Sequence, residues 1–317
     1  MTKVLITGGT GFIGSHIAEA LLEADYEVKV VDNLSNSYIE NLNNVKDKIE
    51  FVNGDITNLD FLNRELKDVD YVLHHAALKY ILESIENPIE YHNVNINGTY
   101  NTLEASRKNN VKGFLFAGSS VVYGDNPILP LKENFVPIPQ STYAVTKLLG
   151  EYYCKLFREN YGLKTVILRY SNVFGPRQDI KSHYAAAVPK FISRILNNEN
   201  PIIWGEGLKT RDFIYVKNIV DANLAVLKYK KFNGDIINIG SGIPTSLNEL
   251  VAIINKFLGK NIKPEYITPF EGDLKHNYLD ISKANDLLGY TQLYDLNYGI
   301  KETIDWIKKQ HEVIMNP

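Results

Sequence analysis

A glycine-rich turn between an apolar strand and an amphipathic helix constrains this chain more than any other feature. The run 3–7 (KVLIT) is short and β-branched, as in a buried strand, and the residues after the turn have apolar side chains at helical spacing. Gly9, Gly11 and Gly14 form the pattern G-x-G-x-x-G. Gly8, Gly11 and Gly14 also fit a variant of this pattern in which the glycines are three residues apart. Without β-carbons, the backbone can turn tightly and approach a pyrophosphate at the helix N-terminus. The alternative is a turn that only closes an ordinary helix.

An acidic residue at the end of the second strand indicates which dinucleotide would bind. The run 28–32 (VKVVD) completes a strand–helix–strand unit, and Asp32 follows Gly14 by 18 residues. A carboxylate at this place accepts hydrogen bonds from an adenosine ribose and repels a 2′-phosphate. The following residues, among them Asn33 and Ser35, include no arginine that would bind such a phosphate. The sequence therefore predicts NAD, and a P-loop is excluded because no lysine follows Gly14.

Strand-like runs alternate with helical patterns along most of the chain. Further runs of this kind lie at 49–52, 71–75, 114–117, 165–169 and 236–239. The alternation predicts the α/β class, with a doubly wound parallel sheet. Beyond Phe174, prolines separate shorter elements, which predicts a smaller α/β lobe over the carboxyl ends of the strands. The predicted domains are 1–173 for the dinucleotide, with a return segment near 211–240, and 174–317 for the substrate.

Composition limits the partners and the compartment. The 317 residues include 34 Lys+Arg and 37 Asp+Glu, for a net charge of -3, without a basic run. Nucleic acid is therefore not an expected partner. No apolar stretch reaches the roughly 20 residues of a membrane helix, so we expect neither a membrane partner nor a signal peptide. The single cysteine, Cys154, cannot form an internal disulfide, and a cytoplasmic location is predicted.

A tyrosine, a lysine and two serines form the candidate catalytic group. Tyr143 and Lys147 stand four residues apart in a helical run that ends at Gly162, so they share a helix face. An ammonium at about 4 Å contributes about 4 kcal/mol at an effective dielectric of about 20, nearly enough to lower a phenol pKa from about 10 to about 7. Ser119 and Ser120 end an apolar strand, where a hydroxyl can relay a proton. A packed tyrosine, a solvated lysine and two turn serines are the alternative.

Two adjacent histidines, His74 and His75, end another predicted strand. No residues at the spacing of metal ligands surround them in the sequence. We therefore predict no metal site and assign both histidines to packing or to support of neighbouring groups.

Together these motifs resemble the extended short-chain dehydrogenase/reductase family, and within it the NAD-dependent UDP-hexose 4-epimerases. The matching stretches run from 5–14 (LITGGTGFIG) to 280–284 (DISKA), nearly the whole chain. The resemblance implies a Rossmann domain, tightly bound NAD and reversible inversion at C4 of a UDP-hexose through a transient 4-keto sugar. It implies that Tyr143 is the base, that Ser119 holds the substrate hydroxyl and that Lys147 anchors the cofactor.

The resemblance also implies a set of contacts to NAD. The implied pyrophosphate and ribose contacts are Gly8, Gly11, Phe12, Ile13, Gly14, Asp32, Asn33 and Ser35. The implied adenine and nicotinamide-side contacts are Asp55, Ile56, Ala76, Ala77, Lys79, Asn95, Tyr143, Lys147 and Tyr170.

A second implied set of residues binds the UDP-sugar. Its members are Lys79, Ser119, Ser120, Tyr143, Asn172, Ala187, Val188, Lys190, Phe191, Gly205, Arg211, Asp273 and Asn277. Arg211 resembles the arginine that binds the diphosphate, for which a planar guanidinium is suited. The family commonly has another arginine where Phe270 stands here, so Lys275 or Arg177 is expected to replace it.

Asn277 resembles the residue that faces the 2-substituent of the sugar. A tyrosine at this position is associated with exclusion of N-acetyl groups, and asparagine is smaller. The resemblance therefore predicts that UDP-GlcNAc and UDP-GalNAc are accepted as well as UDP-Glc and UDP-Gal. The alternative for Asn172, Arg211 and Asn277 is that they are ordinary turn or surface residues.

Three other functions compete with this interpretation. UDP-glucuronate 4-epimerase is the enzymatic alternative, although its substrate carboxylate would need a cationic partner that the sequence does not identify. Dehydration is disfavoured because Ser120 and Val121 stand where dehydratases of the family place acidic residues. A catalytically silent NAD-binding regulator is the non-enzymatic alternative, and the presence of Ser119, Tyr143 and Lys147 argues against it.

The helix predicted over 143–161 has more apolar residues than one buried stripe requires. Members of the family commonly pair two such helices, and we therefore predict a homodimer.

Overall fold

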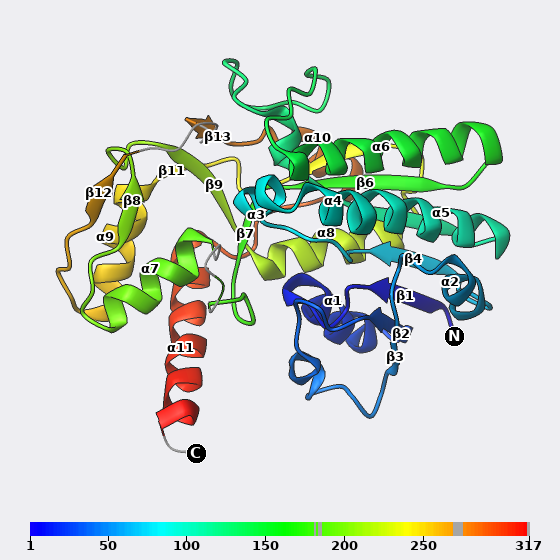
Figure 1. The fold of residues 1–317 in the computed structure, drawn as a ribbon, viewed down its shortest axis with the longest axis horizontal. Helices are drawn as coiled ribbons and strands as arrows, with labels where there is room; N and C mark the ends of the chain where they lie inside the picture. Colours follow the sequence, from blue (N-terminus) through cyan, green and yellow to red (C-terminus); the bar gives the residue numbers. More distant parts are fainter. Residues whose placement is uncertain (181, 183–185, 269–274, 316–317) are drawn as a thin grey trace.

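A seven-stranded parallel sheet forms the centre of the computed structural model, which describes residues 1–180, 182, 186–268 and 275–315 (Figure 1). The strands follow the order β10-β6-β5-β4-β1-β2-β3. They are β1 (Lys3–Thr7), β2 (Glu27–Asp32), β3 (Glu50–Asn53), β4 (Tyr71–His74), β5 (Gly113–Ser119), β6 (Thr165–Tyr170) and β10 (Ile236–Ile239). The order reverses between β1 and β4, the point at which such sheets bind ligands. The predicted doubly wound parallel sheet is confirmed.

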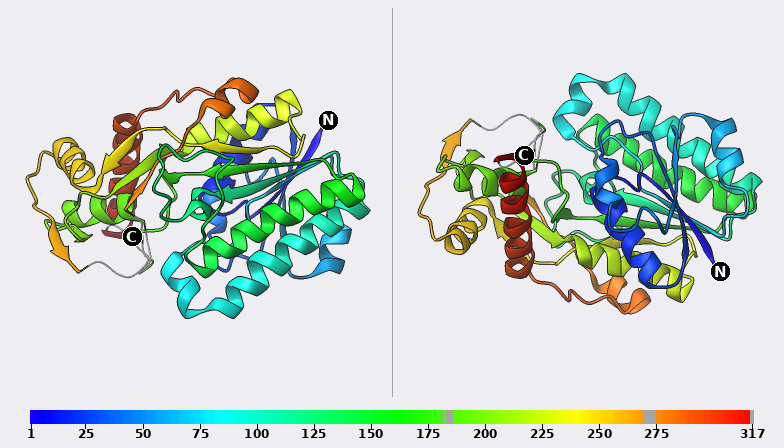
Figure 2. Two further views of the ribbon diagram at one scale, coloured as in Figure 1. Left: turned by 90° about the horizontal axis from the view of Figure 1, so that it is seen from above. Right: turned by 90° about the horizontal axis from the view of Figure 1, so that it is seen from below.

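Helices cover both faces of this sheet, as Figure 2 shows. One face packs against α1 (Phe12–Glu23), α8 (Val216–Tyr229) and α10 (Ser282–Leu288). The other packs against α2 (Leu59–Glu65), α5 (Gly98–Lys108) and α6 (Thr142–Tyr161). Because helices cover both faces, the central strands read as continuous apolar runs rather than alternating ones. Four short elements connect these layers: η1 (Ile39–Leu42), α3 (Ile81–Glu86), α4 (Pro88–Tyr91) and the π-helical η2 (His92–Asn97).

A smaller lobe lies beyond the carboxyl ends of the strands, at the left of Figure 1. Its strands are β7 (Asn172–Phe174), β8 (Ile202–Trp204), β9 (Thr210–Tyr215), β11 (Pro244–Ser246), β12 (Glu265–Ile267) and β13 (His276–Asn277). Its helices are α7 (Ala187–Leu196), α9 (Leu247–Leu258) and α11 (Leu296–Met315). These elements share a separate hydrophobic core, and the predicted smaller α/β lobe is confirmed. The division at residue 173 stays a prediction; β10 belongs to the large sheet.

Local signals define the helix that carries Tyr143 and Lys147. Ser141 precedes α6 and accepts a hydrogen bond from the Ala144 N–H, as an N-cap serine does. Gly162 ends the helix in the left-handed region, with φ of +72°. Across the part of the chain that the structure describes, no helix is both long and apolar enough to cross a bilayer.

Candidate active site

The glycine turn fits closely against the neighbouring strand ends. Gly8 has φ of +73°, and a β-carbon there would lie 2.6 Å from the Ala76 nitrogen. A β-carbon at Gly14 would collide with the Gly8 carbonyl oxygen. Gly11 precedes α1 and has no side chain to accept from the first N–H groups of the helix. The turn therefore offers a side-chain-free surface and a helix N-terminus, which fit the pyrophosphate of a dinucleotide.

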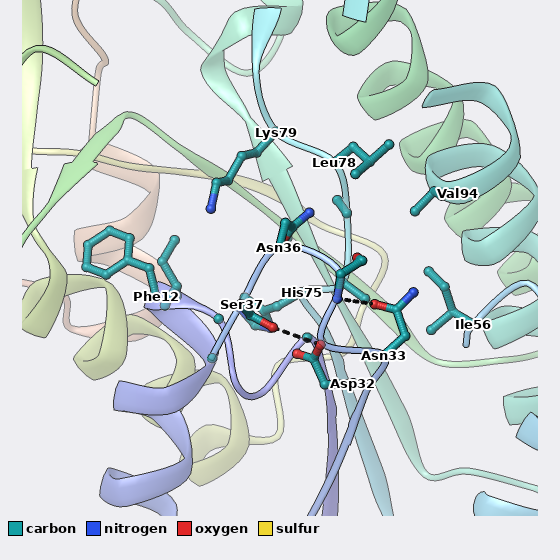
Figure 3. Close-up of a pocket in the computed structure, with 18 of the residues that line it drawn as sticks. Phe12, Asp32, Asn33, Asn36, Ser37, Ile56, His75, Leu78, Lys79 and Val94 are labelled. Atoms are coloured by element: carbon teal, nitrogen blue, oxygen red, sulfur yellow. Dashed lines mark hydrogen bonds between the residues drawn. The ribbon is translucent and has the colours of Figure 1, made fainter. Parts of the chain in front are cut away.

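Asp32 is held at the end of β2 by several donors. The backbone N–H groups of Thr10 and Leu34 donate to its two carboxylate oxygens at 3.1 and 2.9 Å. The Ser37 hydroxyl donates at 3.0 Å, as Figure 3 shows. Asp32 is buried but borders the pocket, so its carboxylate lies where a ribose acceptor is expected.

One pocket gathers most of the predicted cofactor residues. Those that line it are Gly8, Gly11, Phe12, Ile13, Gly14, Asp32, Asn33, Ser35, Ile56, Ala76, Ala77, Lys79, Tyr143, Lys147 and Tyr170. Figure 3 shows the Lys79 side chain extending into the pocket above Ser37. The sequence analysis missed several wall residues whose only signal is that they end or follow a strand: Val31, Gly54, His75, Leu78, Ala117 and Gly118.

Two predicted cofactor residues, Asp55 and Asn95, are not among the residues that line this pocket. Asp55 accepts from the Asn33 amide at 2.8 Å and so orients Asn33. Asn95 is buried on η2, where its amide bonds the Leu78 N–H and carbonyl at 2.8 and 2.9 Å. It also donates to the Thr146 hydroxyl at 3.1 Å. Asn95 thus fixes the loop after β4 against α6.

The predicted catalytic residues converge at the carboxyl end of β5. The Ser119 hydroxyl lies close enough to the Tyr143 phenol to favour its ionised form. The Lys147 ammonium donates to the Ala117 carbonyl at 3.0 Å and lies 6.0 Å from the centre of the Tyr143 ring. Ser120 is buried behind Ser119, at the start of the short helix η3 (Ser120–Tyr123). The structure therefore brings together the serine, the tyrosine and the lysine.

Burial opposes the charged forms of both Tyr143 and Lys147. It raises the pKa of Tyr143 to about 12, against the hydrogen bond from Ser119. It lowers the pKa of Lys147 to about 8, against the Glu151 carboxylate. The expectation that Lys147 alone nearly suffices to ionise Tyr143 is wrong, because it ignored the desolvation of the phenolate. A second positive charge in the pocket would favour the phenolate.

The two histidines at the end of β4 are neutral. Burial lowers the pKa of His75 to about 3 and that of His74 well below its ordinary value. His74 lies between the hydroxyls of Thr7 and Thr99, at 2.7 and 2.9 Å. His75 stacks on Tyr170 and bonds its hydroxyl at 3.1 Å. Among the described residues, no group of three His, Cys, Asp or Glu could hold a metal ion.

The predicted sugar-nucleotide residues come from separate segments of the small lobe. Asn277 on β13 is paired with Arg211 on β9, and its side-chain amide oxygen is buried without a hydrogen-bond partner among the described residues. Arg211 donates to the carbonyls of Thr210 and Lys275 at 2.9 and 3.4 Å. On β7, Asn172 donates to the Asp212 carbonyl at 3.4 Å. β9 and β13 therefore bring Arg211 and Asn277 side by side.

Other predicted sugar-nucleotide residues lie on α7 and after β8. Ala187, Val188, Lys190 and Phe191 are in the first turns of α7, and Gly205 follows β8. The side chains of Val188 and Phe191 pack in the core of the small lobe. Asp273, and Phe270 with it, lie outside the described residues.

The two residues expected to replace the arginine absent at position 270 each donate a hydrogen bond to a carboxylate. Arg177 donates to Glu19 on α1 at 2.6 Å. The Lys275 N–H donates to Asp125 at 3.3 Å.

The family becomes clear when the chain is compared with known proteins. The profile of the NAD dependent epimerase/dehydratase family matches residues 4–240. The chain belongs to this family. The predicted extended short-chain dehydrogenase/reductase family, the epimerase class and the coenzyme NAD are thereby confirmed.

Individual relatives match over nearly the full length. A putative UDP-glucose 4-epimerase of Methanocaldococcus jannaschii is 43% identical, over 97% of this chain and 99% of its own length. A UDP-glucuronate 4-epimerase of Thermodesulfobacterium geofontis is 35% identical, over 99% and 98%. The solved UDP-N-acetylglucosamine 4-epimerase from Methanobrevibacter ruminantium M1, in complex with UDP-N-acetylmuramic acid, has a TM-score of 0.93 and 43% identity, over 98% of this chain and 99% of that one.

Proposed function

We propose that this chain inverts C4 of a UDP-hexose with the help of bound NAD. The observation that carries the proposal is the convergence of Ser119, Tyr143 and Lys147 beside the pocket that contains the glycine turn and Asp32. The names of relatives at 43% identity, a UDP-glucose and a UDP-N-acetylglucosamine 4-epimerase, support the same reaction.

In the proposed reaction, Tyr143 accepts the proton of the C4 hydroxyl while Ser119 holds that hydroxyl in line. NAD, when bound, supplies the hydride acceptor and a positive charge beside the phenol. Because burial raises the pKa of Tyr143 to about 12, the phenol stays protonated until that charge is present. Base activation is therefore coupled to occupation of the pocket. The 4-keto sugar then turns over, and Tyr143 returns the proton when the opposite face is reduced.

An isotope experiment tests this reaction directly. The purified protein is given UDP-glucose with deuterium at C4, and the product is analysed by mass spectrometry and NMR. We expect UDP-galactose that retains the label at C4, because the hydride never exchanges with water. Loss of the label to solvent, or no product from any UDP-hexose, contradicts the proposal.

We propose that the sugar range includes the N-acetylated UDP-hexoses. Support comes from Asn277, which is 3% exposed and pairs with Arg211 in the ladder; within the part of the chain that the structure describes, its side-chain amide oxygen has no hydrogen-bond partner. Such an oxygen can accept a hydrogen bond from the amide N–H of a 2-acetamido group. UDP-glucuronate is the competing substrate, because a relative 35% identical has the name of a UDP-glucuronate 4-epimerase. Product analysis with the three sugar types separates these possibilities.

We further propose a homodimer that forms through α5 and α6. Large apolar side chains remain exposed on these helices: Tyr100 at 40%, Tyr152 at 56%, Leu156 at 42% and Tyr161 at 52%. Several exposed apolar side chains on two neighbouring helices are typical of a protein interface. Light scattering should give twice the 36.0 kDa chain mass. Tyr152→Glu should give the monomer, and a monomeric unaltered protein would contradict the proposal.

A further inference from the structure

Glu151 extends the helix face that carries the proposed catalytic pair. Tyr143, Lys147 and Glu151 stand four residues apart on α6, so their side chains follow one face of the helix. Lys147 and Glu151 are only 6% and 4% exposed. The face is therefore buried, and the proposed reaction as described above gives Glu151 no role.

Arg169 holds the Glu151 carboxylate in place. Its guanidinium donates from Nε and Nη2 to the two carboxylate oxygens at 2.8 and 2.6 Å, which is a bidentate ion pair. Arg169 is 2% exposed on β6, where it pairs with Gly118 of β5. A β-carbon at Gly118 would lie 3.4 Å from Glu151 Oε1. The carboxylate thus rests against the strand that ends in Ser119.

The Lys147 ammonium rests against the same strand. It donates to the carbonyl of Ala117, the residue before Gly118. Burial lowers the pKa of Lys147 to about 8, and the Glu151 carboxylate opposes this shift. Burial likewise raises the pKa of Glu151, which Arg169 and Lys147 oppose. The Glu151 carboxylate is therefore bound directly by Arg169 and acts on Lys147 through its charge.

The other groups around Lys147 contribute no negative charge before the reaction. His74, which ends β4, and His75, which follows it, are neutral because burial lowers the pKa of each. Cys154 on α6 is a neutral thiol because burial raises its pKa well above the ordinary value. The ring of Phe116 lies 5.1 Å from the ammonium. Within the described chain, Glu151 is the carboxylate whose charge acts on Lys147.

We propose that Glu151, oriented by Arg169, is a positioning residue that keeps Lys147 protonated during the reaction. This inference rests on the proposed function and deepens it. During proton transfer the charges then alternate along Tyr143, Lys147, Glu151 and Arg169. Without the carboxylate, the burial of the Lys147 ammonium is no longer opposed, so the lysine releases its proton more readily, whereas the Arg169 guanidinium keeps its charge.

The variant Glu151→Gln tests this role, because glutamine keeps the size and one acceptor for Arg169. The protein is produced with 13Cε-labelled lysine and loaded with NAD, and the lysine signals are followed by NMR. The Lys147 signal is assigned by its loss in Lys147→Met. We expect the titration midpoint of Lys147 to fall by about one pH unit or more. The value of kcat at neutral pH should fall about tenfold, with its pH profile displaced and KM for the sugar little changed.

Matched variants separate charge from packing. Glu151→Asp keeps the charge and should keep the Lys147 midpoint close to that of the unaltered protein. Glu159→Gln makes the same chemical change on the exposed side of α6, where Glu159 lies 3.9 Å from Lys155, and should change nothing. If Glu151→Gln does not fold, Glu151→Leu/Arg169→Met removes both charges together and should still lower the midpoint.

Two results would overturn the inference. One is an unchanged Lys147 midpoint and pH profile in the folded variant that lacks the carboxylate. The other is an Asp variant that lowers the midpoint as much as Gln does. The Lys147 titration is measured without sugar, so an unaltered protein that lacks epimerase activity contradicts the proposed function and leaves this measurement valid.

Discussion

The two ends of the proposed reaction site are built in opposite ways. Around Asp32, backbone N–H groups and a hydroxyl donate to both carboxylate oxygens, so the charged group is satisfied by the fold itself. Around Tyr143 and Lys147, burial disfavours the charged form of each side chain. The first end is complete before any ligand arrives. The second end is organised at the expense of stability and becomes electrostatically complete only with a ligand.

The largest effect on activity should come from the end of the site that contains Tyr143 and Lys147, at the Tyr143 phenol itself. In Tyr143→Phe the ring remains and the proton acceptor is lost, so kcat should fall about 1000-fold, within the range of general acid–base catalysis. Steady-state kinetics with UDP-glucose measures the loss. The control is Tyr153→Phe, which removes a hydroxyl from the same helix at a side chain that packs against Tyr100 of α5. Near-normal turnover of Tyr143→Phe refutes the assigned base.

The next effect concerns folding rather than catalysis. Lys147 has a pKa of about 8 when folded and 10.5 as its ordinary value, so below about pH 8 the folded state carries the full penalty of a buried ammonium. Between these values the folded lysine is neutral while the unfolded one still binds a proton, and the penalty shrinks as pH rises. Lys147→Met should therefore raise the free energy of unfolding at pH 7 by about 3 kcal/mol.

Urea unfolding of the coenzyme-free proteins measures this gain, which should disappear above pH 10.5. Lys155→Met, at an exposed position on α6, should give no gain at either pH. A Lys147→Met protein less stable than the unaltered one at pH 7 would show that the ammonium stabilises the fold.

The two ends also differ in how far the sequence predicts them. Gly14 and Asp32 belong to one contiguous strand–helix–strand unit, so residue spacing alone determines their geometry. The pairing of Glu151 with Arg169 depends on the β5–β6 register, which no local pattern reveals. The acidity expected of Tyr143 was wrong because desolvation depends on the surrounding packing. In the small lobe, Phe191 packs in a core that sequence spacing did not anticipate.

A smaller effect, on the affinity for NAD, is expected at the end of the site that contains Asp32. Asp32→Asn removes the charge and one acceptor oxygen, so NAD should bind about 30-fold more weakly, as for the loss of one charged hydrogen bond of about 2 kcal/mol. The preference for NAD over NADP should shrink as well, because the repulsion of a 2′-phosphate is gone. Fluorescence titration measures both affinities, and Asp47→Asn on the exposed surface is the control. Unchanged NAD affinity would mean that Asp32 supports the turn without contacting the ribose.

The smallest effect tests whether Asn277, like Tyr143 and Lys147, has a polar group that is completed only by a bound ligand. Its side-chain amide oxygen is buried and has no partner in the described ranges, so Asn277 resembles Tyr143 in awaiting a ligand and differs from Asp32. In Asn277→Tyr the larger ring should fill the space of a 2-acetamido group, and the activity ratio of UDP-GlcNAc to UDP-glucose should fall about tenfold. His276→Tyr adds the same ring at the exposed neighbour on β13 and should leave the ratio unchanged. An activity ratio that is equal in both variants would mean that the 2-substituent binds elsewhere. The Asn277 amide oxygen would then have no role in binding the sugar.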